Sequence, residues 1–428
     1  MACDVRRLRR CGALPFGCAL AALWASPAGA SDLHLFTPDA FELSGDVRLV
    51  AVDGEKSWVD GGFGKLRSGS DGDLRLSPQL GNVDLVWKPQ FSWALSATIV
   101  GAVQGGERTQ AGLSQAYLSF RPMRSAGGTA LSARAGLMWP PVSLEHVGDD
   151  WHVKDSITPS AINTWIAEEV RPVAAEGTVA TTLGDNRLRF TAAVMAANDT
   201  AGTLLTFRGW ALHDRTTLAF NRQPLPPLDD EIADYQAPYT HPLLDIPAGF
   251  ALRPGYYAKL AWQPPIPVRV ELFRYDNRAN PIDVTDDLEW GWRTRFNNLG
   301  LVADLGAGAE LRGQAMVGTT RMGFAEDGRR WVDNRFRSAF LLFTRPFGPF
   351  GITLRAEGFD TRNRGSDVND EYDDSGWSAM IAGKREWKHF TALVELLHVS
   401  SERESREDVG LAPRQRQTQL QAEVRIHW

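Results

Sequence analysis

Alternation of polar and apolar side chains constrains this chain more than any other feature. The last ten residues, QLQAEVRIHW, show it most clearly, because Leu420, Ala422, Val424, Ile426 and Trp428 alternate with polar or charged residues. Side chains two residues apart lie on the same face of a β-strand, so the pattern predicts a strand with one polar and one apolar face. A chain that repeats this pattern must cover many apolar strand faces, either in a core or with lipid.

The same pattern recurs along the chain and predicts sixteen strands. The segment 74–87 keeps its alternation only if a β-bulge lies between Leu80 and Val83, because a bulge inserts one extra residue into a strand. The predicted strands span residues 41–51, 74–87, 92–104, 114–121, 131–139, 174–183, 187–196, 256–263, 268–275, 289–296, 309–318, 335–344, 351–359, 376–384, 390–397 and 419–428.

The connections between these strands alternate in length. A transmembrane barrel has short turns at one end and long loops at the other, whereas a soluble β-sandwich has no reason to sort its loops. The long connections are 52–73, 140–172, 198–254, 276–287, 321–334, 361–375 and 399–414, and only 105–111 breaks their series. The short ones are 88–90, 184–186, 264–267, 305–308, 345–349 and 385–388, with 122–129 somewhat longer.

Composition supports a membrane barrel. The mean hydropathy is −0.26, yet the chain carries 15 Trp and 20 Phe. No apolar run after the N-terminal leader approaches the roughly 18 residues that a spanning helix needs. We therefore predict an all-β fold: a transmembrane antiparallel up-and-down β-barrel of about sixteen strands, with short periplasmic turns and long extracellular loops. A soluble all-β sandwich is the alternative.

The last strand predicts how such a barrel closes. In hydrocarbon every backbone N–H and C=O must be paired, so strand 419–428 must pair with the first strand. We expect Leu420, Val424, Ile426 and Trp428 to form the lipid-facing closure face, with Trp428 at the interface, where amphipathic rings are favoured. The same residues are the expected signal for the barrel-assembly machinery.

The N-terminus has the three parts of a secretory signal peptide. Four arginines precede the apolar run GALPFGCALAALWA, and a small-residue site ends at Ala30. Residues 1–30 are therefore predicted to be cleaved and residues 31–428 to form the barrel. Loss of four Arg and one Asp with the leader changes the net charge from −6 to −9, which argues against nucleic acid as a partner.

All three cysteines, Cys3, Cys11 and Cys18, lie in this leader. The predicted mature chain therefore has no thiol for catalysis or for a metal site. An enzyme is not expected either, because His213 with Asp214, and His398 with Ser400, form no partner set that spacing alone can assemble. We expect no cofactor and no metal.

In these features the chain resembles a Gram-negative outer-membrane porin of the sixteen-stranded type. Locally, RAGLMWPPVSLE (134–145) resembles a strand-to-loop segment of the phosphate-selective porin family, with Gly136, Pro141 and Glu145 at the matching positions. The chain departs from the porin pattern by ending in Trp rather than Phe, and it lacks the lysine cluster behind that family's anion preference. The resemblance implies an integral outer-membrane channel for passive diffusion of small polar or charged solutes.

The long connection 140–172 is expected to fold into the barrel and narrow it. It carries bulky apolar residues, among them Trp151 and Trp165, that a loop in water would leave exposed. Acids of this loop facing wall arginines would create a transverse field at the pore constriction. The expected constriction residues are Glu145, Asp149, Asp150 and Asp155 on the loop and Arg293, Arg295 and Arg337 on the wall. The alternative is a loop that packs over the mouth, as a lid or a subunit contact.

Two functions stay open from the sequence: a passive diffusion channel, and a non-conducting barrel used for binding or adhesion. The expected partners are outer-membrane lipid, lipopolysaccharide and small solutes. A homotrimer is one option, because small outward-facing side chains on strands five to seven let a neighbouring wall approach closely, although the general abundance of alanine explains them equally well. These residues are Ala133, Ala135, Ala175, Gly177, Ala192 and Ala196.

Overall fold

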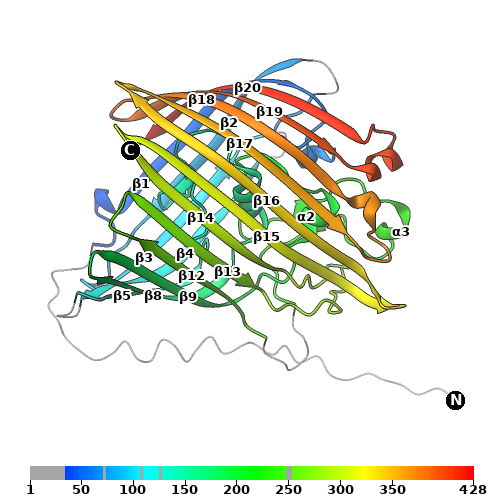
Figure 1. The fold of residues 1–428 in the computed structure, drawn as a ribbon, viewed down its shortest axis with the longest axis horizontal. Coiled ribbons are helices and arrows are strands. Elements are labelled where there is room, and N and C mark those ends of the chain that lie inside the picture. The colour runs from blue at the N-terminus through cyan, green and yellow to red at the C-terminus, as the bar shows by residue number, and fades with distance from the viewer. Residues whose placement is uncertain (1–33, 71–73, 107–108, 125–127, 247–252) are drawn as a thin grey trace.

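The computed structural model describes residues 34–70, 74–106, 109–124, 128–246 and 253–428. Sixteen strands form one closed antiparallel barrel, in which each strand pairs with its neighbours in chain order (Figure 1). The predicted fold class and number of strands are confirmed. The predicted signal peptide, residues 1–30, lies outside the described residues.

The strands of the barrel differ in length, and β15 and β16 are the longest, with 18 and 19 residues. The bounds are β1 Phe41–Asp53, β2 Arg75–Trp87, β3 Leu95–Gln104, β4 Gln110–Arg124, β5 Ala130–Leu137, β8 Val173–Leu183, β9 Asn186–Ala196, β12 Gly255–Gln263, β13 Val268–Asp276, β14 Arg295–Gly306, β15 Ala309–Glu326, β16 Arg329–Phe347, β17 Phe350–Asn363, β18 Asp374–Glu386, β19 Phe390–Glu402 and β20 Arg414–His427.

The last strand closes the barrel as predicted. β20 pairs antiparallel with β1 along ten residue pairs, and Trp428 exchanges two backbone hydrogen bonds with Leu43. The side chains of Leu420, Val424, Ile426 and Trp428 face outward and are 42–75% exposed in the isolated chain. Lipid covers these side chains in a membrane, as the closure face requires.

The predicted bulge is present in β2. Two residues of β2, Gly81 and Asn82, oppose the single residue Asp46 of β1. The backbone N–H of Asn82 donates a hydrogen bond of 2.8 Å to the Asp46 carboxylate. The extra residue shifts the alternation by one position, so Leu80 before the bulge is exposed on the outer face while Asp84 after it lines the lumen.

One predicted strand is misplaced. The segment 289–296 is mostly loop, and strand β14 begins only at Arg295. The tryptophans at 290 and 292 alternate because both are buried in an apolar cluster under the long loops. Alternation caused by packing inside a loop has the same appearance in the sequence as alternation along a wall.

The predicted long connection 321–334 is also wrong. β15 and β16 continue to Glu326 and Arg329 and join through a two-residue turn. Figure 1 shows this hairpin, in yellow, projecting at the long-loop end of the barrel. The strands therefore extend past the apolar band into a region where the outer face is wet.

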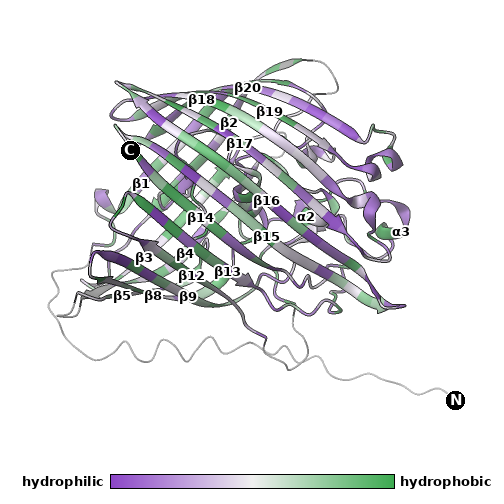
Figure 2. Ribbon diagram, viewed as in Figure 1, coloured by the Kyte–Doolittle hydropathy of each residue, from purple (hydrophilic) through white to green (hydrophobic). Residues whose placement is uncertain are grey.

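An apolar band covers the outer face of the wall. Laterally paired residues form its rows, and Figure 2 shows hydrophobic and hydrophilic residues alternating along the strands. None of the helices among the described residues is long and apolar enough to cross a membrane. One apolar row reads Leu301, Gly313, Leu341 and Ala356 across β14, β15, β16 and β17.

Short elements occupy the loops at the long-loop end and one segment before β1. The connection 138–172 contains β6 His146–Val147, β7 His152–Val153 and α1 Ala161–Glu169, and the connection 197–254 contains α2 Thr203–Phe207, β10 Gln223–Pro224, α3 Asp230–Ala233 and β11 Tyr239–Thr240. The 3-10 turns are η1 Pro38–Ala40, η2 Trp58–Asp60, η3 Asp370–Tyr372 and η4 Glu404–Val409.

Candidate functional site

The connection 138–172, named here the inserted loop, lies inside the barrel as predicted. Glu395 on β19 accepts a hydrogen bond of 2.7 Å from the backbone N–H of Ile157. Lys259 on β12 donates one of 2.7 Å to the carbonyl of Pro141. Because β12 and β19 lie on roughly opposite sides of the closed sheet, the inserted loop crosses the lumen.

Helix α1 of the inserted loop packs against one side of the inner wall. The ring of Trp165 is fully buried, and its centroid lies 5.4 Å from that of Phe296 and 5.1 Å from that of Phe336. This packing excludes water from that side of the lumen. The wall residues in this packing, named the aromatic sector, are Phe273, Phe296, Phe336, Phe340 and Phe359.

The connection 197–254, named the covering loop, packs onto the inserted loop. Glu168 at the end of α1 binds Arg208 and His213 of the covering loop, each through a contact of 2.7 Å. Burial opposes the ionisation of Glu168, but the charges of Arg208 and His213 outweigh it and lower its pKa to about 2. The two loops are therefore joined by a buried ionic contact.

Glu169, the next residue, has a different environment. Burial dominates there and raises its pKa to about 7, although the indole N–H of Trp165 and the backbone N–H of Leu204 donate to it at 2.7 and 2.9 Å. The carboxylate thus accepts hydrogen bonds from α1 and from the first turn of α2.

Buried charges of the wall hold the inserted loop on the side of β17. Arg355 donates to Glu145 of the loop at 3.0 Å and to Glu357 at 3.1 Å. Glu357 in turn accepts from the backbone N–H of Ala161 at 2.7 Å. Burial opposes the ionisation of Glu145, but Arg355 and hydrogen bonds from the loop itself place its pKa below the usual value.

A polar cavity of about 40 Å³ lies between the β6–β7 hairpin and the inner wall of β1 to β3. This volume has room for roughly three water molecules. Its lining includes Asp46, Arg48, Asn82, Asp84 and Gln104 from the wall, His146, Asp150, Trp151 and His152 from the inserted loop, and Asp214 and Thr216 from the covering loop.

Ion pairs balance most of the charge around the polar cavity. Arg48 contacts Asp46, and its guanidinium also lies 2.9 Å from both Asp214 and Glu423. Arg67 binds Asp214 from the other side at 2.9 Å. Burial opposes the ionisation of Asp214, but Arg48 and Arg67 hold its pKa well below the usual range.

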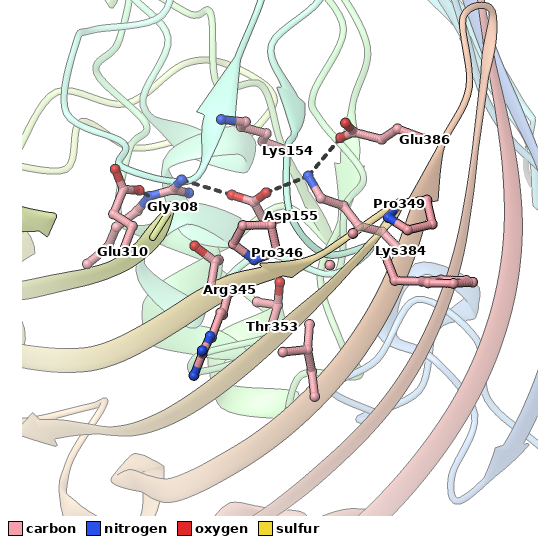
Figure 3. Close-up of a pocket in the computed structure, with 16 residues that line it drawn as sticks. Lys154, Asp155, Gly308, Glu310, Arg345, Pro346, Pro349, Thr353, Lys384 and Glu386 are labelled. Carbon is pink, nitrogen blue, oxygen red and sulfur yellow. Dashed lines mark hydrogen bonds and ion pairs between the residues drawn. The ribbon is translucent and has the colours of Figure 1, made fainter. Parts of the chain in front are cut away.

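A second cavity, of about 300 Å³, opens near the short-turn end and is named the vestibule. Asp155 of the inserted loop lies in it, bound by Arg312 and Lys384 at 2.8 Å each, and Lys384 also contacts Glu386 (Figure 3). Burial opposes the ionisation of Asp155, but these two cations lower its pKa. The vestibule is thus a polar space with charges of both signs.

A third cavity, of about 570 Å³, lies beside these two at the short-turn end. It shares Asp150 and His152 with the polar cavity and Lys154 and Glu386 with the vestibule. The three cavities therefore adjoin one another around the tip of the β6–β7 hairpin.

The four loop acids predicted from the sequence all contact inner-wall residues. Glu145 and Asp155 bind arginines of the wall, as described above. Asp150 accepts hydrogen bonds from Ser44 at 2.9 Å and from His152 at 2.8 Å. The carboxylate of Asp149 accepts a hydrogen bond of 3.4 Å from Tyr117 on β4, and it lies 3.2 Å from the ammonium of Lys88 in the turn after β2.

The three predicted wall arginines are not their partners. Arg293 contacts Asp276 within 3.3 Å and Arg295 contacts Thr319 within 3.2 Å. Arg337 binds Asp360 within 2.7 Å, and its side chain is 70% exposed. Arg295 and Arg337 point outward, because the neighbouring residues Phe296 and Phe336 take the inward positions and pack on α1.

The sequence-based prediction did not pair the loop with its wall partners Arg312, Arg355 and Lys384, and it did not single out the acid Asp84. A usable signal existed for Asp84, since the bulge fixes which residues of β2 face inward. For the others, alternation identifies a lumen face but does not identify which loop atom meets it. Among the described residues no cluster of three or more His, Cys, Asp or Glu has an arrangement that could hold a metal ion.

A closed sixteen-stranded barrel with an apolar outer band and charges in its lumen defines an integral outer-membrane β-barrel. The chain is similar to the anion-selective porin from Comamonas acidovorans, with a TM-score of 0.52, 12% identity, and 91% of this chain and 98% of that chain covered. At this identity the likeness shows the fold alone.

Two further solved structures match with lower scores. One is a loop L8 deletion mutant of OmpT, an outer membrane protein of Vibrio cholerae, with a TM-score of 0.48, 7% identity, and 91% of this chain and 99% of that chain covered. The other is a mutant of the Rh. blastica porin, with a TM-score of 0.38, 10% identity, and 91% and 100% covered. No family model and no curated protein sequence matches the chain, so membership of the phosphate-selective family is not shown.

Proposed function

We propose that this barrel is a channel for the passive diffusion of small polar or charged solutes across the outer membrane. The observation that carries the proposal is the polar cavity between the β6–β7 hairpin and β1 to β3, with larger charged cavities beside it. A charged, water-accessible route along one wall is what a porin needs. The constriction lies where Asp150 and His152 of the hairpin face Arg48 and Asp84 of the wall.

A non-conducting barrel for binding or adhesion is the second candidate. The aromatic sector favours it, because α1 fills a large part of the lumen with buried rings. A barrel closed by such a core still presents its long loops to the outside. The two candidates differ in whether the polar cavity is a continuous water path.

Single-channel recording in a planar lipid bilayer tests the proposal. The purified protein should give discrete conductance steps. Replacing residues 147–152 with two glycines should raise the conductance severalfold, because it withdraws the hairpin from the polar cavity and leaves Glu145, Asp155 and α1 in place. The substitution Phe220→Ala, at a residue 84% exposed on the covering loop, is the matched control and should change nothing.

Absence of conductance from both wild type and the hairpin variant would favour the second candidate, provided that heat-modifiable gel mobility shows inserted barrels. We assign no catalytic role. The two histidines considered from the sequence have structural partners, since His213 binds Glu168 at 2.7 Å and His398 binds Thr418 at 2.9 Å.

We propose lipopolysaccharide as the lipid partner of the long-loop half. Arg295, Thr319, Arg335 and Arg362 pair side by side on the outward face of β14 to β17, above the apolar rows. Guanidinium groups bind phosphate well, and the outer leaflet carries phosphorylated lipid A. The substitutions Arg335→Gln and Arg362→Gln together should reduce co-purified lipid phosphate, measured after detergent extraction. Unchanged phosphate content would contradict this assignment.

We also propose a homotrimer joined through β5, β8 and β9, and insertion through the barrel-assembly machinery by the closing strand. The small outward row Ala133, Gly177 and Ala192 is laterally paired, which supports close approach of a second wall. Mass measurement in mild detergent tests the trimer, and a result of monomers only would contradict it.

A further inference from the structure

Asp84 occupies a position that the bulge in β2 creates. Asn82 and Asp84 share the inward face of β2, and Asn82 pairs directly with Gln104 on β3. All three line the polar cavity. A side chain on Gly81 would collide with the Asp46 carboxylate and the Arg48 guanidinium, so glycine there lets the bulge and the Asp46–Arg48 pair coexist.

The carboxylate of Asp84 takes no part in the ion pairs formed by the charged residues around it. Arg48, Arg67 and Arg425 contact Asp46, Asp214 and Glu423, three cations with three anions. The side-chain carboxylate of Asp84 has no hydrogen bond and no ion pair with any residue that the structure describes. Burial disfavours the charged form of Asp84, and the negative charges of Asp150 and Asp46 disfavour it further, so an ionised carboxylate here calls for a counter-ion.

Two neutral oxygens complete the surroundings of Asp84. Gln104 is 1% exposed, and its amide nitrogen donates to Thr216 at 2.6 Å, which leaves its oxygen without a hydrogen-bond partner. The side-chain oxygen of Asn82 is likewise buried without a partner. A buried acceptor without a donor is costly unless a ligand or water satisfies it.

We propose that Asp84, Asn82 and Gln104 form a binding site for a small monovalent cation such as Na⁺ or K⁺, and that this site makes the channel prefer cations. Oxygen donors alone suit hard cations, and one free carboxylate with two amide oxygens gives the low site charge that suits weak, exchanging binding. Arg48 does not oppose a cation here, because three carboxylates surround it.

The selectivity part rests on the proposed channel function, whereas binding does not. Sodium-23 NMR of the protein in detergent measures binding directly. Wild type should broaden the sodium line, and Asp84→Asn should reduce the excess width severalfold. Gln104→Leu, which keeps every charge, should also reduce it, whereas a long-range charge effect would leave Gln104→Leu unchanged. Asp185→Asn, in an exposed turn, is the matched control.

Reversal potentials under a KCl gradient measure selectivity. Wild type should favour potassium over chloride, and Asp84→Asn should bring the permeability ratio severalfold closer to one. An equal sodium linewidth in wild type and Asp84→Asn overturns the site, leaving only trapped water in the cavity. If Asp84→Asn loses the broadening of the sodium line but keeps the reversal potential of wild type, the site binds cations but does not determine the selectivity of the channel. Lost broadening in a barrel that never conducts overturns the proposed channel and keeps the cation site.

Discussion

The aromatic sector and the wall of the polar cavity belong to the same barrel but differ in what they face. On β16 the inward positions include Phe336 and Phe340, which pack on α1. On β1 the inward positions include Asp46 and Arg48, which line the polar cavity. Strand geometry is the same in both regions, so the difference comes from the loop segment opposite each wall. Alternation therefore reports which residues share a face, while the loops decide which face is dry.

The largest effect should follow from opening the aromatic sector. Trp165→Ala removes a fully buried ring from the centre of this packing, and we expect a loss of about 4 kcal/mol in the free energy of unfolding. Urea titration in detergent, followed by gel mobility, measures it. Phe220→Ala, at an exposed position, should lower the free energy of unfolding far less. A loss for Trp165→Ala as small as the control would mean that the sector does not hold the loop.

At the wall of the polar cavity the corresponding change is Arg48→Met. It leaves the carboxylates of Asp46, Asp214 and Glu423 together without their shared cation, and we expect a loss of about 3 kcal/mol. The same urea titration applies. Adding Asp46→Asn should recover part of the loss, because Asp214 and Glu423 keep Arg67 and Arg425 as partners whereas Asp46 forms its ion pair with Arg48. Failure of the second substitution to recover any stability would show that the network is held by packing rather than by charge.

A smaller and pH-dependent effect should come from Glu169, the carboxyl group beside Trp165. Its folded pKa is raised to about 7 from 4.5, so its contribution is full below about pH 4.5 and is lost as the pH rises through about 7. The urea midpoint of wild type should fall over this range. Glu169→Gln should flatten the profile there. Parallel profiles for the two proteins would contradict the assignment.

The smallest effect is expected at Arg337, on the wet outer face of the same strand that carries Phe336. The Arg337 side chain is 70% exposed, and an ion pair made by such an exposed side chain contributes little. Arg337→Ala should leave the urea midpoint unchanged within error, in contrast to Arg48→Met. A shift comparable to that of Arg48→Met would show that the Arg337–Asp360 pair contributes substantially to the stability of the barrel.

Much of the wall could be predicted from the sequence, because few architectures pair every backbone N–H and C=O group of a strand in lipid. Closure by strand 419–428 and the bulge after Leu80 both follow from alternation alone. Insertion of the loop 140–172 into the lumen was predicted from its bulky apolar residues, such as Trp165. In each case a single local pattern determines the outcome.

The site was less predictable, because it depends on contacts between segments far apart in the chain. Arg337 was assigned to the lumen on the assumption that every apolar face meets lipid, whereas Phe336 and Phe340 instead meet α1. Likewise, nothing local in the sequence indicates that Glu145 binds Arg355 rather than Arg293. Three-dimensional packing decides such pairs.

The contacts of β20 with the inserted loop have a consequence for assembly of the barrel. Arg425 donates to the carbonyl of Val153, and Gln421 donates to Thr158, so the same strand that pairs with β1 also binds the loop. Contacts between the two ends of a chain close the longest loop and form late. Because the inserted loop hydrogen-bonds to β20, packing of this loop in the lumen and pairing of β20 with β1 stabilise each other. Closure of the barrel is therefore coupled to the filling of its lumen.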